Sequence, residues 1–140
     1  MLSNKAKILA IISRIPPQKV MYFGQISQLV GLPPRVVGWI LSGLSVAECE
    51  IVPWYRVVAK DGFIASLKLG AKGIQQRLKL QAEGYHLHHN RVNMSKHCLT
   101  DQELRQIYAD FFRLIEPTLK LAELVVRVGS NLLSLLRRRF

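Results

Sequence analysis

Apolar residues recur at helical spacing near the N-terminus, at positions 8, 9, 11, 12 and 15. This pattern predicts a helix that Ser3 or Asn4 caps and that Pro16-Pro17 ends. Two more amphipathic stretches, at about 24–30 and 34–43, flank the turn Gly31-Leu32-Pro33. Two short helices joined by a three-residue turn that contains glycine are the outline of a helix-turn-helix, a pattern that many other helix pairs share.

The middle of the chain predicts a β-hairpin. Residues 56–59 and 63–65 read as short strands on either side of Lys60-Asp61-Gly62, which is typical of a turn. The irregular stretch 44–52 precedes them, a helix from about 72 to 83 follows, and residues 85–94 could add another short strand. The predicted fold is therefore mostly α with a small β hairpin, a winged helix-turn-helix domain.

The C-terminal part predicts a helical extension. Thr100 and Glu103 have capping-box spacing, and a helix could run from there to about Glu116, where Pro117 interrupts it. Beyond it, residues 118–139 have a wide apolar face that would pack on the domain, self-associate or bind a protein partner; a membrane is the least favoured choice. We place the domain at 1–97 and the amphipathic helical extension at 98–140.

The charge is uneven. The formal net charge is +11, and residues 1–97 hold 13 Lys and Arg against 4 Asp and Glu. A concentrated positive field attracts polyanions such as DNA, although a generally basic protein with no nucleic-acid role has the same composition. The N-terminus lacks a signal-peptide pattern, and no apolar run reaches the roughly 18 residues of a membrane span.

Cysteine and histidine usage predicts neither a disulfide framework nor a metal site. Cys49 and Cys98 lie far apart, which suits a reducing cytoplasm, with a nucleoid or nuclear location for a DNA-binding protein. His86 and His88 would share one face of a strand, so a weak metal site is conceivable, but surface positions on a hairpin are favoured. We expect no cofactor.

Four segments carry a family resemblance. Residues 52–58 contain Pro53-Trp54-Tyr55-Arg56, which resembles the active-site strand of the O6-alkylguanine-DNA alkyltransferases, where the motif reads Pro-Cys-His-Arg-Val. Residues 15–26, 31–38 and 80–85 resemble other family segments in the same order, so the resemblance covers roughly residues 6–97. In the family the cysteine accepts the alkyl group. Here Trp54 has no thiolate, and the phenol of Tyr55, with an ordinary pKa of about 10, is a poor base. The resemblance implies an alkyltransferase-like protein, which is not an enzyme.

The resemblance also implies roles in opening DNA. Arg35 stands at the position of the arginine finger, which fills the space that an extruded nucleotide leaves. Phe23 holds the position of a tyrosine that helps to rotate the nucleotide, and Tyr22 could supply the missing hydroxyl. Gly38 would allow a close approach of the recognition helix to DNA or to a neighbouring helix. The alternatives are a solvated or phosphate-binding Arg35 and a Phe23 that only packs in the core.

A lesion pocket is implied around the motif. Trp54 and Tyr55, beside Pro53, would line it as aromatic walls. Composition alone favours Trp54 as a core aromatic, and the motif context favours the pocket. Ser66 belongs to the loop that closes over the base in the family, and Lys68 is the candidate there for contacting the base or its phosphate. Arg56 would hold the strand in place. Glu83 matches the glutamate of the catalytic relay and would here only form a structural hydrogen bond, with Tyr55 as a candidate partner.

Three functions follow. The leading one is non-enzymatic recognition of O6-alkylguanine in duplex DNA by base flipping, which flags the lesion for another pathway. The resemblance implies nucleotide excision repair proteins as partners. The alternative is a winged-helix DNA-binding or regulatory protein without lesion specificity. Alkyl transfer through Cys49 is disfavoured, because Cys49 lies four residues before Pro53 in a different register.

Overall fold

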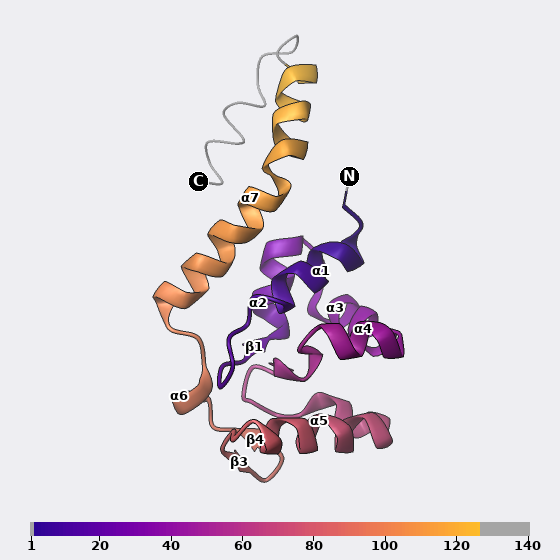
Figure 1. Ribbon diagram of the computed structural model, residues 1–140, viewed down its shortest axis with the longest axis vertical. Coiled ribbons are helices and arrows are strands. Elements are labelled where there is room, and N and C mark those ends of the chain that lie inside the picture. The colour runs from indigo at the N-terminus through magenta and orange to yellow at the C-terminus, as the bar shows by residue number, and fades with distance from the viewer. Residues whose placement is uncertain (1, 127–140) are drawn as a thin grey trace.

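The N-terminal half is built from short helices, as predicted. The computed structural model describes residues 2–126 (Figure 1). Helix α1 (Asn4–Ile12) begins where the Ser3 hydroxyl accepts a hydrogen bond from the amide of Ala6, at 3.1 Å. Helices α2 (Phe23–Val30) and α3 (Pro34–Ser42) pack against each other. The predicted helix-turn-helix is therefore present.

The turn between α2 and α3 follows from its residues. Gly31 ends α2 in the left-handed region at φ 72°, where a side chain would be strained. Pro34 then occupies the first turn of α3, where its missing N–H costs no hydrogen bond. The two residues together fix the angle at which α3 leaves α2.

The strands differ from the prediction. Strand β1 (Met21–Tyr22) pairs in parallel with β2 (Val57–Val58). The turn after β2 does form, since the amide of Gly62 donates to the carbonyl of Ala59 at 2.8 Å. The predicted return strand at 63–65 is wrong, however, because Phe63 forms only an isolated bridge with Arg91 and the chain then enters a 3-10 helix, η2 (Ala65–Leu69).

A true hairpin lies further along the chain. Strands β3 (Leu87–His88) and β4 (Arg91–Val92) pair antiparallel. The two residues between them, His89 and Asn90, both have positive φ, which is the backbone of a tight hairpin turn. The fold is thus mostly helical with two small strand pairs and a winged-helix layout.

Four further elements complete the domain. Helix α4 (Val46–Ile51) lies in the stretch predicted to be irregular, and the side chains of Ser45 and Glu48 cap it reciprocally. The 3-10 helix η1 (Trp54–Arg56) leads into β2. Helices α5 (Ala71–Ala82) and α6 (Met94–His97) flank the hairpin.

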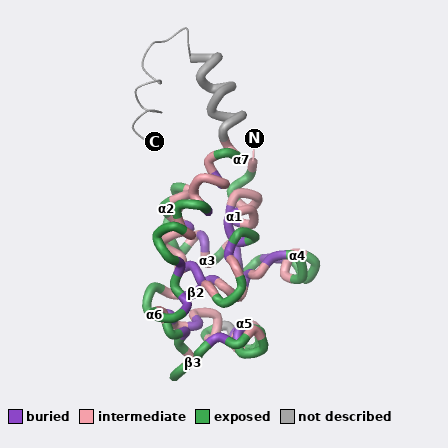
Figure 2. The backbone as a smooth tube through the Cα atoms, turned by 60° about the vertical axis from the view of Figure 1, so that its left-hand side comes forward, coloured by how far each residue is buried: buried purple, intermediate pink, exposed green. Residues whose placement is uncertain are grey.

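Two apolar clusters form the interior, and buried segments run through the middle of the molecule in Figure 2. The larger cluster joins α1, α2 and α3 to Trp54 and Val57. The smaller one lies beneath α5 and the β3–β4 hairpin. Tyr55 is half-buried and packs against both clusters, so the motif segment connects the two parts of the core.

Helix α7 (Asp101–Val126) continues past Pro117, so the predicted break there is wrong. Before and within it, Leu99, Ile107 and Phe111 are buried in the larger cluster, which attaches the helix to α1. An ion pair of 3.7 Å between Arg14 and Asp110 adds to this contact. The side chains of the apolar face predicted over 118–139 lie outside the described residues. Within residues 2–126, no helix is long and apolar enough to cross a membrane.

Candidate nucleic-acid interface and base pocket

A cavity of about 360 Å³ opens between α3, the motif segment, η2 and the start of α5. One face of α3 forms one side of it, and η2 and α5 form the opposite side. The lining is largely apolar and includes three cations. Its residues are Phe23, Arg35, Gly38, Trp39, Leu41, Ser42, Trp54, Val57, Ala65, Ser66, Lys68, Lys72 and Gln76.

The α3 side of the cavity is a single helical stripe. Arg35, Gly38, Trp39 and Ser42 are spaced by three and four residues, so they share one face of the helix. The opposite face is buried, through Val37 and Leu41, although Leu41 also reaches the cavity edge. Helix α3 therefore presents Arg35 and its neighbours at the cavity.

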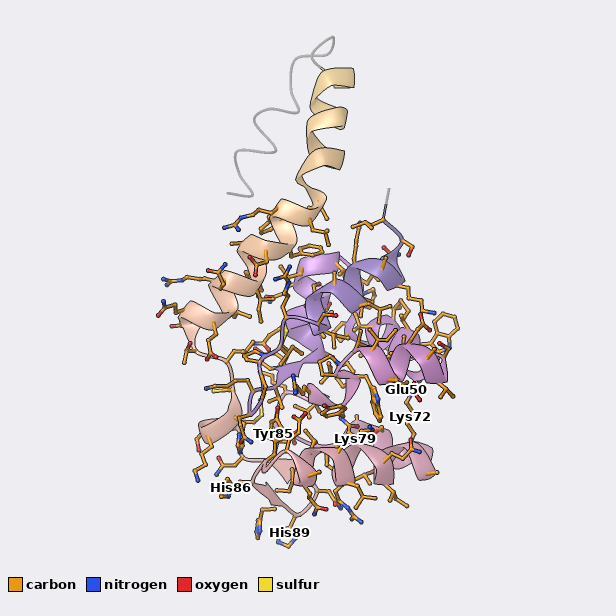
Figure 3. All side chains as sticks on the ribbon, viewed as in Figure 1. Glu50, Lys72, Lys79, Tyr85, His86 and His89 are labelled. Atoms are coloured by element: carbon orange, nitrogen blue, oxygen red, sulfur yellow. The ribbon has the colours of Figure 1, made fainter. Side chains whose placement is uncertain are left out.

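Trp54 forms a wall of the cavity. Its side chain is only 5% exposed and belongs to the larger core cluster, so Trp54 is both a core aromatic and a lining residue of the cavity. The Lys72 ammonium lies over the indole, 5.2 Å from the ring centroid. Lys72 also donates to the carbonyls of Leu41 and Ser42, at 3.0 and 3.2 Å. Figure 3 shows Lys72 and Lys79 pointing from α5 toward the rest of the domain.

Gln76 joins the loop over the cavity to the motif. Its side chain is 3% exposed, and its amide nitrogen donates to the carbonyls of Tyr55 and Val57, at 3.1 and 2.9 Å. The Ser66 hydroxyl donates to the amide oxygen of Gln76. A buried amide with three partners fixes both segments, so Gln76 holds η2 over the motif.

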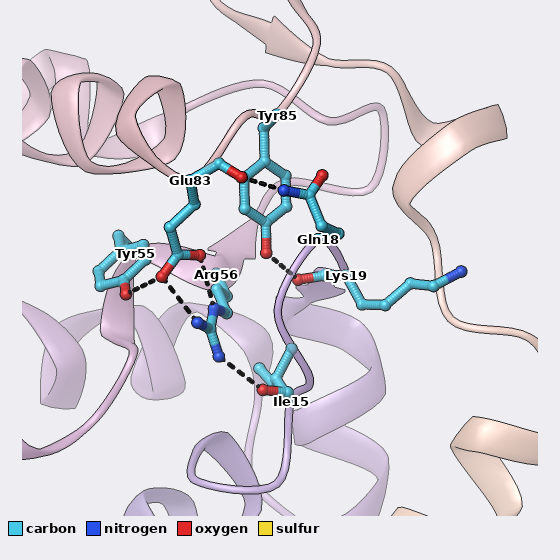
Figure 4. A network of polar contacts seen from close by, with 7 residues as sticks. All are labelled: Ile15, Gln18, Lys19, Tyr55, Arg56, Glu83 and Tyr85. Atoms are coloured by element: carbon cyan, nitrogen blue, oxygen red, sulfur yellow. Dashed lines mark hydrogen bonds and ion pairs between the residues drawn. The ribbon is translucent and has the colours of Figure 1, made fainter.

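Glu83 is the centre of a polar network behind the motif (Figure 4). It accepts the hydroxyl of Tyr55, as the sequence analysis suggests, and a pair of hydrogen bonds from Arg56 at 2.7 and 3.0 Å. Arg56 also donates to the carbonyl of Ile15 at 2.8 Å. The network therefore ties the motif to the end of α5 and to the segment after α1.

The polar network around Glu83 changes the pKa values of Tyr55 and Glu83. Burial raises the pKa of Tyr55, and its hydrogen bond to Glu83 raises it further. Burial opposes ionisation of Glu83, but the hydrogen bonds from Arg56 and Tyr55 outweigh it and lower the pKa of Glu83. Tyr55 is thus held as a neutral donor to a carboxylate, a state in which it cannot act as a base at neutral pH.

The structure brings most of the candidate DNA-contacting and pocket residues together. Phe23, Arg35, Gly38, Lys68, Trp54 and Ser66 all line the cavity. Three others lie elsewhere: Tyr22 is the N-cap residue of α2, Pro53 precedes η1, and Tyr55 turns to Glu83. Arg56, which the sequence analysis expects to hold the strand in place, pairs with Glu83. Tyr55 is therefore placed behind the cavity instead of on its wall.

Of the lining residues that the sequence analysis did not name as site residues, Trp39, Lys72 and Gln76 have the largest effect on the cavity. Lys72 and Gln76 act through backbone carbonyls far away along the chain, which leaves no local pattern. Trp39 could have been noticed as an aromatic residue four positions after Arg35 on a predicted recognition helix.

The ionisable groups that line the cavity are all cationic. None of its lining residues is a cysteine, histidine, aspartate or glutamate. Cys49 lies on α4, half-buried, and is not a lining residue. Within residues 2–126, no three His, Cys, Asp or Glu side chains cluster as metal ligands would. The lining fits binding of a flat, partly apolar group near phosphates.

Known proteins are similar to this chain in sequence and in fold. Residues 3–85 match the family described as 6-O-methylguanine DNA methyltransferase, DNA binding domain. The chain is 41% identical over 80 residues to the DNA base-flipping protein of Vibrio parahaemolyticus, which is 56% of this chain and 76% of that protein. It is 32% identical over 84 residues to Alkyltransferase-like protein 1 of Schizosaccharomyces pombe, which is 59% of this chain and 76% of that protein.

Two solved structures of related proteins have a similar fold. The crystal structure of S. pombe Atl1 in complex with damaged DNA containing O6-carboxymethylguanine superposes with a TM-score of 0.63 at 26% identity, over 71% of this chain and 99% of that one. The structure of S. pombe ATL in complex with DNA gives a TM-score of 0.59 at 27% identity, with the same coverage. By sequence and fold, the chain belongs to the 6-O-methylguanine DNA methyltransferase DNA-binding family, among its alkyltransferase-like members.

Proposed function

We propose that this protein recognises O6-alkylguanine in duplex DNA by flipping the base into the cavity beside α3, without chemical turnover. The observation that carries the proposal is the pairing of Arg35 and Trp54 on the walls of one cavity of about 360 Å³. That volume lies within the range of about 300–1,000 Å³ of small-molecule sites. A cation on the recognition helix and an aromatic wall are what extrusion and binding of a base require.

Each lining residue has a physical role in this proposal. Arg35 fills the gap in the base stack, and its charge stays near phosphates. Phe23, at the start of α2, keeps a ring against the rotating nucleotide but has no hydroxyl. Lys68 neutralises a phosphate or contacts the bound base, and Trp54 supports the alkylated purine.

The relatives support lesion reading over general DNA binding. One of them is named a DNA base-flipping protein, and another was crystallised with DNA that contains O6-carboxymethylguanine. Because the chain covers 99% of that crystallised protein, the part that holds damaged DNA there has its counterpart here. The subsequent step, in which the marked lesion passes to nucleotide excision repair, is the finer part of the proposal.

Absence of turnover follows from the two motif positions. Trp54 replaces the acceptor thiol, and the hydroxyl of Tyr55 stays protonated and donates a hydrogen bond to Glu83, so it cannot accept a proton. A flipped O6-alkylguanine would therefore stay intact in the cavity. Recovery of a labelled alkyl group on the protein would contradict this.

The decisive experiment compares affinity for two duplexes that differ only in one O6-methylguanine. We expect tighter binding of the damaged duplex, and Arg35→Ala and Trp54→Ala should each reduce that preference. Arg105→Ala, on the exposed face of α7, is the matched control for loss of a positive charge. Equal affinity of the wild-type protein for both duplexes would favour the winged-helix DNA binder without lesion specificity.

A further inference from the structure

Trp39 is an exposed aromatic side chain on the recognition helix. It is 76% exposed, whereas Trp54 is 5% exposed. Tryptophan gains much from burial, and at interfaces its flat ring often carries a large share of the binding energy. In the described fold the indole of Trp39 is not buried, so the side chain is available to a partner.

The position of Trp39 on α3 indicates which kind of partner could contact it. Trp39 lies one helical turn after Arg35 and directly after Gly38, on the face of α3 that lines the cavity. It also lines a second, shallower hollow of about 290 Å³ with Lys5, Ile40, Ser42 and Gly43. The indole therefore forms a ridge between the base cavity and this second hollow.

We propose that Trp39 packs against the nucleotide next to the flipped one, so that the ridge separates the extruded base from its neighbour on the same strand. This inference rests on the proposed function, because it needs a base in the cavity. The flipped nucleotide lies on one side of the indole and the sugar and base of the adjacent nucleotide on the other. Stacking on an aromatic ring is tolerant of sequence, since every base has a flat face.

Charge around the ridge favours DNA over a protein partner. Arg35, Lys68 and Lys72 surround the cavity side without any lining carboxylate. On the far side, Lys5 is paired with Glu48 at 2.8 Å, so the cationic character belongs to the cavity side. A strand that enters the cavity passes these cations and then the ridge.

The competing occupant is a protein that docks on exposed apolar residues. Val46 and Ile51 on α4 are 79% and 80% exposed, and with Trp39 they could form a docking surface. Neither residue lines the cavity or the second hollow. They therefore provide a control of matched exposure, which separates a DNA contact from a general apolar patch.

The first test measures affinity for the O6-methylguanine duplex. Trp39→Ala should weaken binding by about fivefold or more, the loss expected for one base–aromatic stack, and Trp39→Phe should keep most of the affinity. Ile51→Ala should bind as the wild type does. Binding by Trp39→Ala that equals wild type, or an equal loss in Ile51→Ala, would overturn the inference.

The second test needs no variant. The chain has two tryptophans, and only Trp39 is exposed, so iodide quenching of fluorescence reports on it. The damaged duplex should shield it from iodide, and unchanged quenching in the saturated complex would overturn the inference. Failure of the proposed function appears differently, as equal affinity of the wild type for both duplexes. Failure of this inference alone appears as a wild type that prefers the damaged duplex together with a Trp39→Ala variant that binds this duplex as tightly as the wild type does.

Discussion

The ammonium group of Lys72 lies over the indole of Trp54, 5.2 Å from the ring centroid. Two of its protons are directed to the carbonyls of Leu41 and Ser42, at the end of the recognition helix. One side chain of α5 thus holds both the wall of the cavity and the helix that borders it. The width of the cavity depends on this contact.

Replacing Lys72 tests that dependence. Lys72→Met keeps the apolar stem and removes the charge, so α3 and Trp54 lose their common anchor. We expect affinity for the O6-methylguanine duplex to fall roughly three- to thirtyfold, about 0.7–2 kcal/mol, because the cavity loses the contact that joins its two sides. The control is Lys79→Met, one further charge on α5 whose ammonium lies 5.6 Å from the Tyr55 ring and outside the cavity lining. Equal losses in the two variants, measured by fluorescence anisotropy, would mean that only net charge matters.

The helix-turn-helix and most helix positions could be predicted from the sequence, because their apolar faces repeat with helical period around Gly31 and Pro34. Helix α4 could not, since its apolar ends Val46 and Ile51 point to solvent and leave no amphipathic pattern. The turn at Gly62 was also predictable from its residues. The partner of β2 was not, because that strand pairs with β1, more than thirty residues earlier.

Some residues of the site could likewise be predicted from the sequence, and others could not. Arg35, Phe23 and Trp54 are recognisable because they stand in motifs with fixed spacing. Lys72 and Gln76 act on backbone carbonyls of distant segments, and any residue type can supply a carbonyl. The orientation of Tyr55 depends likewise on Glu83, which is distant in sequence.

Restoring the thiol alone should not restore alkyl transfer. In Trp54→Cys the neighbouring Tyr55 would still donate to Glu83, and its raised pKa, caused first by burial and then by that bond, prevents it from accepting the thiol proton. We expect the double variant Trp54→Cys/Tyr55→His to take up labelled methyl from O6-methylguanine DNA about a hundredfold faster, the typical contribution of a general base. Trp54→Ser is the blank, and equal rates for the single and double variants would show that position 55 does not control the chemistry.

The Glu83 network should give the protein a dependence on acid. Because the pKa of Glu83 is lowered, its carboxylate stabilises the fold fully above its ordinary value of 4.5, and this contribution is lost as pH falls below that value toward the lowered pKa. Glu83→Gln should lower the free energy of unfolding at pH 7 by about 1–3 kcal/mol, since Arg56 loses its charged partner. Urea titrations from pH 7 to pH 3 should show a shallower loss in the variant than in the wild type. Glu50→Gln, on the exposed side of α4, serves as the control, and parallel profiles of Glu83→Gln and wild type would refute the assignment.

Helix α7 should contribute to the stability of the whole domain. Phe111 is 4% exposed and belongs to the same cluster as α1, so Phe111→Ala should cost about 3–5 kcal/mol of unfolding free energy. Leu114→Ala, one turn further along and about half exposed, should cost much less. Both values follow from urea denaturation of the full chain. A small effect at Phe111 would mean that the helix and the domain unfold separately.

Gly38 separates stability from binding. A methyl group there would meet the ring of Phe23 at 3.7 Å, an ordinary contact, so packing within the domain does not require glycine. Gly38→Ala should therefore stabilise the protein by up to about 1 kcal/mol, through helix propensity. If α3 approaches DNA closely at this position, the same methyl group should weaken binding of the O6-methylguanine duplex about five- to a hundredfold, the cost of overpacking a tight contact. Thermal melting measures the change in stability, and fluorescence anisotropy on the same sample measures the change in DNA affinity. A variant that melts higher and binds as the wild type does would place the DNA away from this face of the helix.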